Sequence, residues 1–238
     1  EYGGRGLSIV QQVIWLEEYA KAHAPWIGAN FVGVNHGGPT LIINASEAQK
    51  EYHLPRILKG EAFWCQGFSE PGAGSDHAGI KTRGRIEGNE LVINGSKIWT
   101  SFAHVADWQE LVLRTEEGSQ RHRGLSWVIC PMHAPGIEIR PIIDSTGDGH
   151  FCEIVFTDVE VPGSHLVGEP NGGWEIAKYL LTHEREMISS IGDRGSNRSV
   201  AKSALAKIGA DATGRLADPL LRAQIAAFEV DESAFRLL

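Results

Sequence analysis

The sequence has few cysteines, no long apolar run and no excess of basic residues, and each shortage excludes a class of protein. Three scattered cysteines, Cys65, Cys130 and Cys152, suggest neither a disulfide framework nor a zinc site. No apolar run approaches the roughly 20 residues that cross a bilayer, and the first residues lack a signal-peptide pattern. The net charge of −8 makes nucleic acid and anionic membranes poor partners. We expect a protein of a reducing compartment, either the bacterial cytoplasm, which we favour, or the mitochondrial matrix.

The chain is long enough for real hydrophobic cores. Its 238 residues are 42% hydrophobic and 22% charged, which is an ordinary globular composition. Glu1 is not an initiator methionine, and the last residues stop inside a helical pattern. We therefore expect the sequence to be part of a longer protein.

Hydrophobic periodicity divides the chain into three zones and predicts an α+β fold. Residues 1–61 follow a helical period and form a partial N-terminal helical domain. Residues 62–172 alternate with period two and predict a middle domain that is an antiparallel barrel or sandwich, with Asn94-Gly95 as a hairpin turn. Residues 173–238 return to the helical period and form the start of a C-terminal helical bundle.

Glu184 is the first candidate for chemistry. On the predicted helix it shares one apolar stripe with Ala177, Leu181 and Ile188. A carboxylate in apolar surroundings is a stronger base than an exposed one, as proton abstraction from carbon requires. The alternative is a carboxylate at a helix-packing seam that Arg185 or another arginine neutralises.

Two further stretches are ambiguous when taken singly. Trp99 precedes Thr100 and Ser101, and an aromatic ring beside two hydroxyls can stack on a planar heterocycle and bond to its polar edge. A core tryptophan explains the same pattern. The segment FSEPGAGSD, which starts at Phe68, supplies hydroxyls and glycines that permit close backbone approach to a ligand, and an ordinary turn-rich loop is again the alternative.

In combination these stretches resemble the acyl-CoA dehydrogenase family. The resemblance is carried by QGFSEPGAGSD (66–76) and INGSKIWTS (93–101), with support from VPGSHLVGEPNGGW (161–174) and THER (182–185). It implies a helical N-terminal domain, a middle β domain and a C-terminal four-helix bundle.

The resemblance also implies a set of site residues. Ser75 would face the acyl-pantetheine chain, and Arg185 matches the arginine usual beside the active site, where it would join Glu184 in catalysis and substrate binding. His183, next to Glu184, is a candidate to line the acyl pocket, and simple exposure is the alternative. Glu184 matches the position from which one branch of the family supplies its catalytic base, whereas most members carry the base in a later segment that this chain does not contain. Contacts to FAD are expected from Gln66, Gly67, Phe68, Ser69, Gly74, Ser75, Trp99, Thr100 and Ser101.

The activity implied is FAD-dependent α,β-dehydrogenation of an acyl-CoA thioester to a trans-2-enoyl-CoA in fatty acid or lipid degradation. Electrons would pass to an electron-transferring flavoprotein, and the enzyme would be a homotetramer or a heterotetramer. Two alternatives stay open. One is a non-catalytic partner subunit of a heteromeric dehydrogenase, and the other is a flavin oxidase or monooxygenase of related fold.

Overall fold

The computed structural model describes residues 2–191 and 199–236. Contacts group the chain into two compact units, Glu1–Met187 and Ile188–Leu238. Within the described residues, no helix combines the length and apolar character that crossing a membrane requires. The predicted domain boundaries at 61/62 and 172/173 stay predictions, and each falls between two secondary-structure elements.

The N-terminal residues are helical, as predicted, and their ends are set by local side chains. Ser8 and Ser46 each close a capping box with a glutamine three residues later, and Gly60 ends its helix in the left-handed conformation at φ 69°. The elements are α1 (Ile9–Lys21), η1 (Gly28–Asn30), the π-helix η2 (Gly33–Gly37), α2 (Gly38–Asn44) and α3 (Glu47–Lys59).

The middle zone forms one mixed sheet, so the α+β fold is confirmed but the purely antiparallel barrel is not. Its path runs β6-β7-β3-β2-β4-β5-β8, with β1 paired to β4. The β1–β4 and β2–β4 pairs are parallel, because β1 is joined to β4 by a long crossover rather than by a turn. The strands are β1 (Trp64–Gly67), β2 (Arg83–Glu87), β3 (Glu90–Ser101), β4 (Trp108–Arg114), β5 (Leu125–Pro131), β6 (Ile137–Ile142), β7 (Phe151–Pro162) and β8 (Leu166–Val167). Short 3-10 turns lie at η3 (His77–Gly79), η4 (Ala103–Val105) and η5 (Gly163–His165).

The predicted hairpin at Asn94-Gly95 is wrong. The strands turn instead at Gly88-Asn89, between β2 and β3, and β3 runs on through Asn94 and Gly95. The register against β7 shifts there, and Gly95 has φ 142°. A Cβ at Gly95 would lie 2.6 Å from the Thr82 hydroxyl. The glycine therefore marks a bulge with close chain approach, not a turn.

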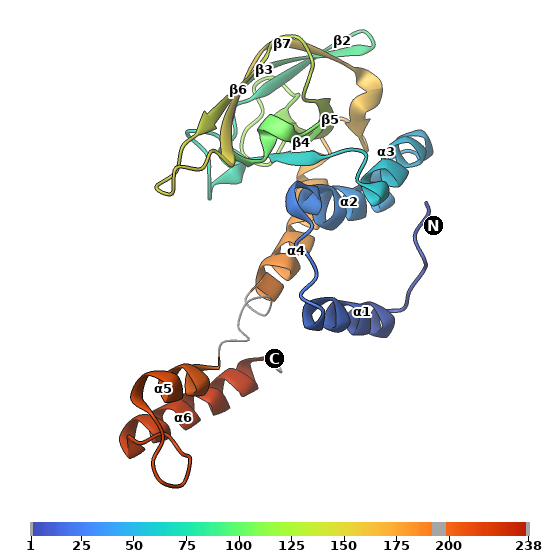
Figure 1. Cartoon of the computed structure of the whole chain (residues 1–238). Coiled ribbons are helices and arrows are strands. Elements are labelled where there is room, and N and C mark those ends of the chain that lie inside the picture. Colours follow the sequence, from blue (N-terminus) through green and yellow to red (C-terminus); the bar gives the residue numbers. More distant parts are fainter. Residues whose placement is uncertain (1, 192–198, 237–238) are drawn as a thin grey trace. The chain divides into compact units, whose positions relative to one another are not determined.

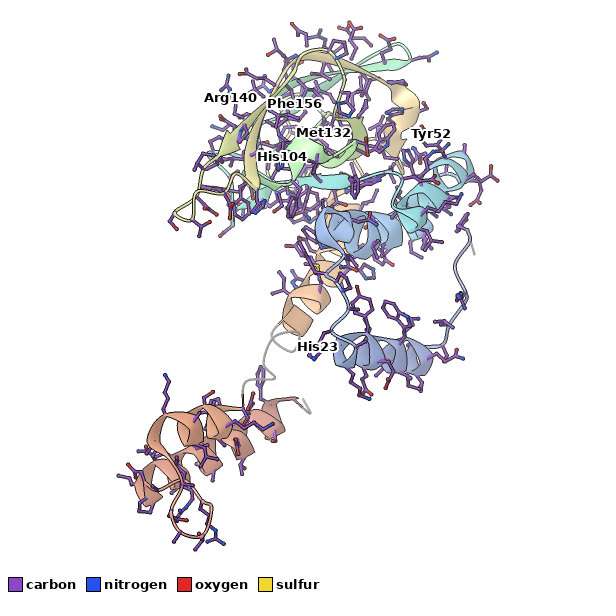
Figure 2. The ribbon with its side chains drawn as sticks, in the orientation of Figure 1. His23, Tyr52, His104, Met132, Arg140 and Phe156 are labelled. Carbon is purple, nitrogen blue, oxygen red and sulfur yellow. The ribbon has the colours of Figure 1, made fainter. Side chains whose placement is uncertain are left out.

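Both faces of the sheet are buried, and alternate residues of one strand enter different cores. In β4, Val112 packs with residues of α2, α3 and α4, whereas Leu111 and Leu113 pack with β3 and β7 on the other face. Figure 1 shows α2 beside the strands that carry the first core. Met132 and Phe156 belong to the second core, while Arg140 lies on the outer strand β6 (Figure 2).

The third zone is helical, as predicted. It contains α4 (Gly173–Ile191), α5 (Val200–Ile208) and α6 (Pro219–Arg236). Asp218 accepts hydrogen bonds from the backbone N–H groups of Leu220 and Leu221, so it caps α6 with Pro219 in the first helical position.

Candidate active site

The segment from Gln66 to Ser75 leaves β1 and folds back on itself. Glu70 and Ala73 exchange two backbone hydrogen bonds of 2.9 and 3.0 Å, which close a tight turn. Gly74 and Ser75 follow on the surface, whereas Gly67 and Phe68 are buried. The segment therefore has an anchored start and an accessible end.

A buried ion pair holds this turn in place. Lys97 is fully buried, and its Nζ lies 2.9 Å from Glu70 Oε1. The other donors to Glu70 are the backbone N–H groups of Lys81 and Thr82. Although burial raises the pKa of Glu70, Lys97 and these donors bring it below its ordinary value. Glu70 is thus fully engaged as a structural carboxylate.

Two further bonds tie the loop to the strand that carries Trp99. Lys97 Nζ also donates to the Phe68 carbonyl at 3.0 Å, and the Ile98 N–H donates to the Ser69 carbonyl at 2.9 Å. The two predicted cofactor segments, joined here by residues 29 positions apart in sequence, are therefore neighbours in the fold.

A distortion of β3 exposes the side chain of Trp99. The register against β7 shifts between Lys97 and Thr100, and Trp99 has φ 62° with 59% of its surface exposed. Bulges and left-handed non-glycine residues concentrate at functional sites, where they re-aim side chains. Within residues 2–191 and 199–236, the buried Thr100 hydroxyl has no hydrogen-bond partner, and Ser101 is half-buried. An open indole beside such hydroxyls fits a planar, hydrogen-bonding cofactor.

The ring of Phe68 packs against the ring of His77, which in turn stacks on Trp174. The Phe68 ring lies 4.8 Å from that of His77 at 20°, and His77 lies 6.2 Å from Trp174 at the start of α4. Burial lowers the pKa of His77 to about 4, so the imidazole is neutral at physiological pH. The stack fixes Phe68 against α4 and orients the first half of the loop.

Gln66 connects the loop to the candidate base. Its Nε2 donates to Glu184 Oε2 at 3.1 Å, although the two residues are 118 positions apart. Gln66 and Trp64 share the face of β1 that packs against the helices, and Glu184 projects from α4 toward that face. Glu184 is half-buried, as expected for a carboxylate on the apolar stripe. The structure thus brings together two of the predicted site residues.

Two further predicted site residues, His183 and Arg185, flank Glu184 in the sequence of α4. His183 is half-buried, and its ring lies 4.9 Å from that of Tyr179, one turn earlier on α4. Arg185 is exposed. The described hydrogen bond to the Glu184 carboxylate comes from Gln66.

Sequence reasoning missed two buried residues beside Gln66. Glu110 in β4 is its register partner, and the carboxylate is fully buried. His36 in η2 lies against it, with 3.6 Å between Nδ1 and Oε1. The available signal was a glutamate inside the apolar strand sequence WQELVLR, which period-two alternation places on the same face as Val112.

A basic groove lies beside β2 and the loop that follows β4. It has a volume of about 910 Å³, and its cationic chains could bind an anion such as a phosphate. Two glutamates, Glu116 and Glu117, also line it. The cationic lining residues are Lys81, Arg83, Arg85, Arg114 and Arg121.

Family comparison agrees with the order of these elements. The family model of the acyl-CoA dehydrogenase N-terminal domain matches residues 1–61, and the model of the acyl-CoA dehydrogenase middle domain matches residues 65–159. The chain belongs to the acyl-CoA dehydrogenase family, whose members are flavoprotein oxidoreductases.

Several individual relatives are similar to most of the chain. It is 46% identical over 82% of its length to acyl-CoA dehydrogenase IpdE1 of Mycobacterium tuberculosis, of which it spans 50%. The solved Tcur3481-Tcur3483 steroid ACAD has a TM-score of 0.84 and 37% identity, over 99% of this chain and 59% of that one. The ChsE4-ChsE5 complex from Mycobacterium tuberculosis has a TM-score of 0.78 and 31% identity, over 99% and 61%. The chain thus spans about half to three fifths of these relatives.

Proposed function

We propose that the protein containing this chain catalyses FAD-dependent α,β-dehydrogenation of an acyl-CoA to a trans-2-enoyl-CoA. The observation that carries the proposal is the Gln66–Glu184 hydrogen bond of 3.1 Å, which joins the cofactor loop to the candidate base. Without that contact, nothing would link the loop that is proposed to bind FAD to the residue that is proposed to remove the proton.

FAD would be held by the loop at residues 66–75 and by the end of β3 that carries Trp99. Trp99 offers an exposed ring for stacking, and Thr100 offers a buried hydroxyl that lacks a partner among the described residues. The residues present fit such a group, with Gln66–Ser69 supplying backbone contacts and Ser101 a further hydroxyl. Bound FAD would supply the two-electron acceptor for the reaction.

Glu184 is the proposed base that removes the α-proton of the thioester. The Gln66 amide donates to one of its oxygens and leaves the other free to take a proton. Ser75, His183 and Arg185 are proposed to contact the substrate at the edge of this site. The basic groove with Arg121 offers a place for phosphate groups of coenzyme A.

The acyl group and the partners are inferred from relatives. One solved relative is called a steroid ACAD, so we propose a bulky lipid acyl-CoA as substrate and lipid degradation as the role. The same name and that of the ChsE4-ChsE5 complex each join two proteins, which favours a heterotetramer over the homotetramer. Electron-transferring flavoprotein is the proposed acceptor, and the bacterial cytoplasm is the proposed location.

A colour change tests the proposal. The complete protein, purified with any natural partner, should be yellow and should bleach when a bulky acyl-CoA is added without an electron acceptor. A protein that takes up no FAD would contradict the proposal. Rapid reoxidation of the reduced flavin by oxygen would instead support the oxidase or monooxygenase alternative.

A further inference from the structure

A buried acid–base pair lies directly behind the proposed site. Glu110 and His36 are 0% and 3% exposed, and their nearest charged atoms are 3.6 Å apart. Carboxylates this deeply buried are rare unless they are paired or have a function. Neither residue belongs to the cofactor motifs, and the proposed reaction does not yet use them.

The pair connects to Glu184 through one side chain. Glu110 and Gln66 are register partners on neighbouring parallel strands, and both point to the face of the sheet that packs against the helices. Gln66 Nε2 donates to Glu184 Oε2 at 3.1 Å. Gln66 therefore neighbours two carboxylates that come from different elements, and among the described residues its amide donates to Glu184.

The charges of these groups depend on one another. Burial raises the pKa of Glu110 to about 7, with His36 acting against it and Glu184 adding to it. Although burial lowers the pKa of His36, the carboxylates of Glu110 and Glu184 bring it above its ordinary value. The titratable groups around Glu110 are His36 from η2, Glu184 from α4 and Cys65 from β1. Burial raises the pKa of Cys65 well above its ordinary value, so this thiol stays neutral.

We propose that Glu110 and His36 form a positioning pair that sets the orientation of Glu184 through Gln66. The inference rests on the proposed function of Glu184 as the base. The Gln66 amide, which the β1–β4 pairing places beside Glu110, holds one oxygen of Glu184 and leaves the other free for the proton. The buried pair thereby limits the positions that Gln66, and through it Glu184, can adopt.

The rate of flavin reduction by substrate, measured against pH, tests the pair. The profile of the unmutated protein should change slope near pH 7, where Glu110 titrates, and Glu110→Gln should abolish that change. Gln66→Leu should lower the rate at every pH, because Glu184 loses the donor that orients it. Glu175→Gln is the matched control, since it removes an exposed carboxylate of α4 about 14 Å along the helix from Glu184. Its profile should coincide with that of the unmutated protein.

A second measurement does not depend on turnover. Infrared titration of the protein should reveal a carboxyl group that titrates near pH 7, and its signal should vanish in Glu110→Gln. The same signal should move to lower pH in Glu184→Gln, because one of the two like charges is gone. If it stays in place, the coupling does not exist and the inference is wrong.

The two failures are distinguishable. If Glu184→Gln abolishes flavin reduction while the Glu110→Gln profile superimposes on that of the unmutated protein, the positioning pair is refuted and the proposed function stands. If Glu184→Gln reduces flavin at the unmutated rate, the assignment of the base fails, and the infrared shift alone then decides whether the two carboxylates interact.

Discussion

Replacing Lys97 by methionine tests how firmly the loop at residues 66–75, which is proposed to bind FAD, is held. Methionine keeps the length of the chain but removes the 2.9 Å ion pair to Glu70 and the 3.0 Å hydrogen bond to the Phe68 carbonyl. Glu70 is 93% buried as a side chain and would retain only its backbone donors. Removing one partner of a buried pair typically costs about 3–5 kcal/mol, because the other charge stays buried without compensation. We expect a loss of this size in the free energy of unfolding.

Urea unfolding followed by tryptophan fluorescence provides the assay. The control is Arg140→Met, which breaks the exposed 2.7 Å pair with Glu138 and should cost about 0–1 kcal/mol. The double variant Lys97→Met/Glu70→Gln should recover part of the loss, since no unpaired charge remains. A loss in Lys97→Met no larger than in the control would refute the claim that the pair holds the loop.

The same pair predicts a pH dependence. Lys97 and the backbone donors hold the pKa of Glu70 below its ordinary value, so its stabilising effect is present above the unfolded value of about 4.3 and is lost as pH falls through the folded pKa. Burial lowers the pKa of Lys97 to about 8, so both charges exist between these limits. The stability gap between the unmutated protein and Lys97→Met should narrow below about pH 4. A constant gap would contradict this origin.

Two further substitutions separate packing from cofactor binding. Gly67→Ala should lower the unfolding free energy by about 1–3 kcal/mol, seen as a lower Tm, because the added Cβ would lie 2.6 Å from Gln109 Oε1; an unchanged Tm would contradict the tight fit. Trp99→Ala should change stability by no more than about 0.5 kcal/mol, since the ring is 59% exposed, yet it should release flavin on gel filtration. Trp15→Ala, at a site 54% exposed on α1, is the control and should retain flavin; equal retention in both variants would contradict the stacking role.

Hydrophobic periodicity allowed the helical zones to be predicted from the sequence. The structure adds the helix ends, which the capping boxes at Ser8 and Ser46 and the N-cap at Asp218 fix through residues within one turn. The prediction of a hairpin at Asn94-Gly95 was wrong because an Asn-Gly pair forms a turn only where the surrounding packing lets the chain reverse. Here the chain passes Thr82 closely and β3 continues against β7, so tertiary packing overrode the local preference.

The site was only partly accessible from sequence. The apolar stripe placed Glu184 on a packed helix face, but its contact with Gln66 joins elements 118 residues apart and could not be derived from spacing. Glu110 and His36 were missed for the same reason. A single acid in an apolar strand is not informative until the fold supplies the parallel β1–β4 pairing that puts it beside Gln66.

The most direct test of the account is the anaerobic reduction of bound flavin by acyl-CoA in the Glu184→Gln protein, followed by stopped-flow absorbance. The account predicts that this variant retains FAD and loses most of its reduction, because the hydrogen bond to Gln66 can persist while the proton acceptor is gone. The control variant Glu175→Gln should be reduced at the unmutated rate. Reduction of Glu184→Gln at that same rate would contradict the central claim that Glu184 takes the proton.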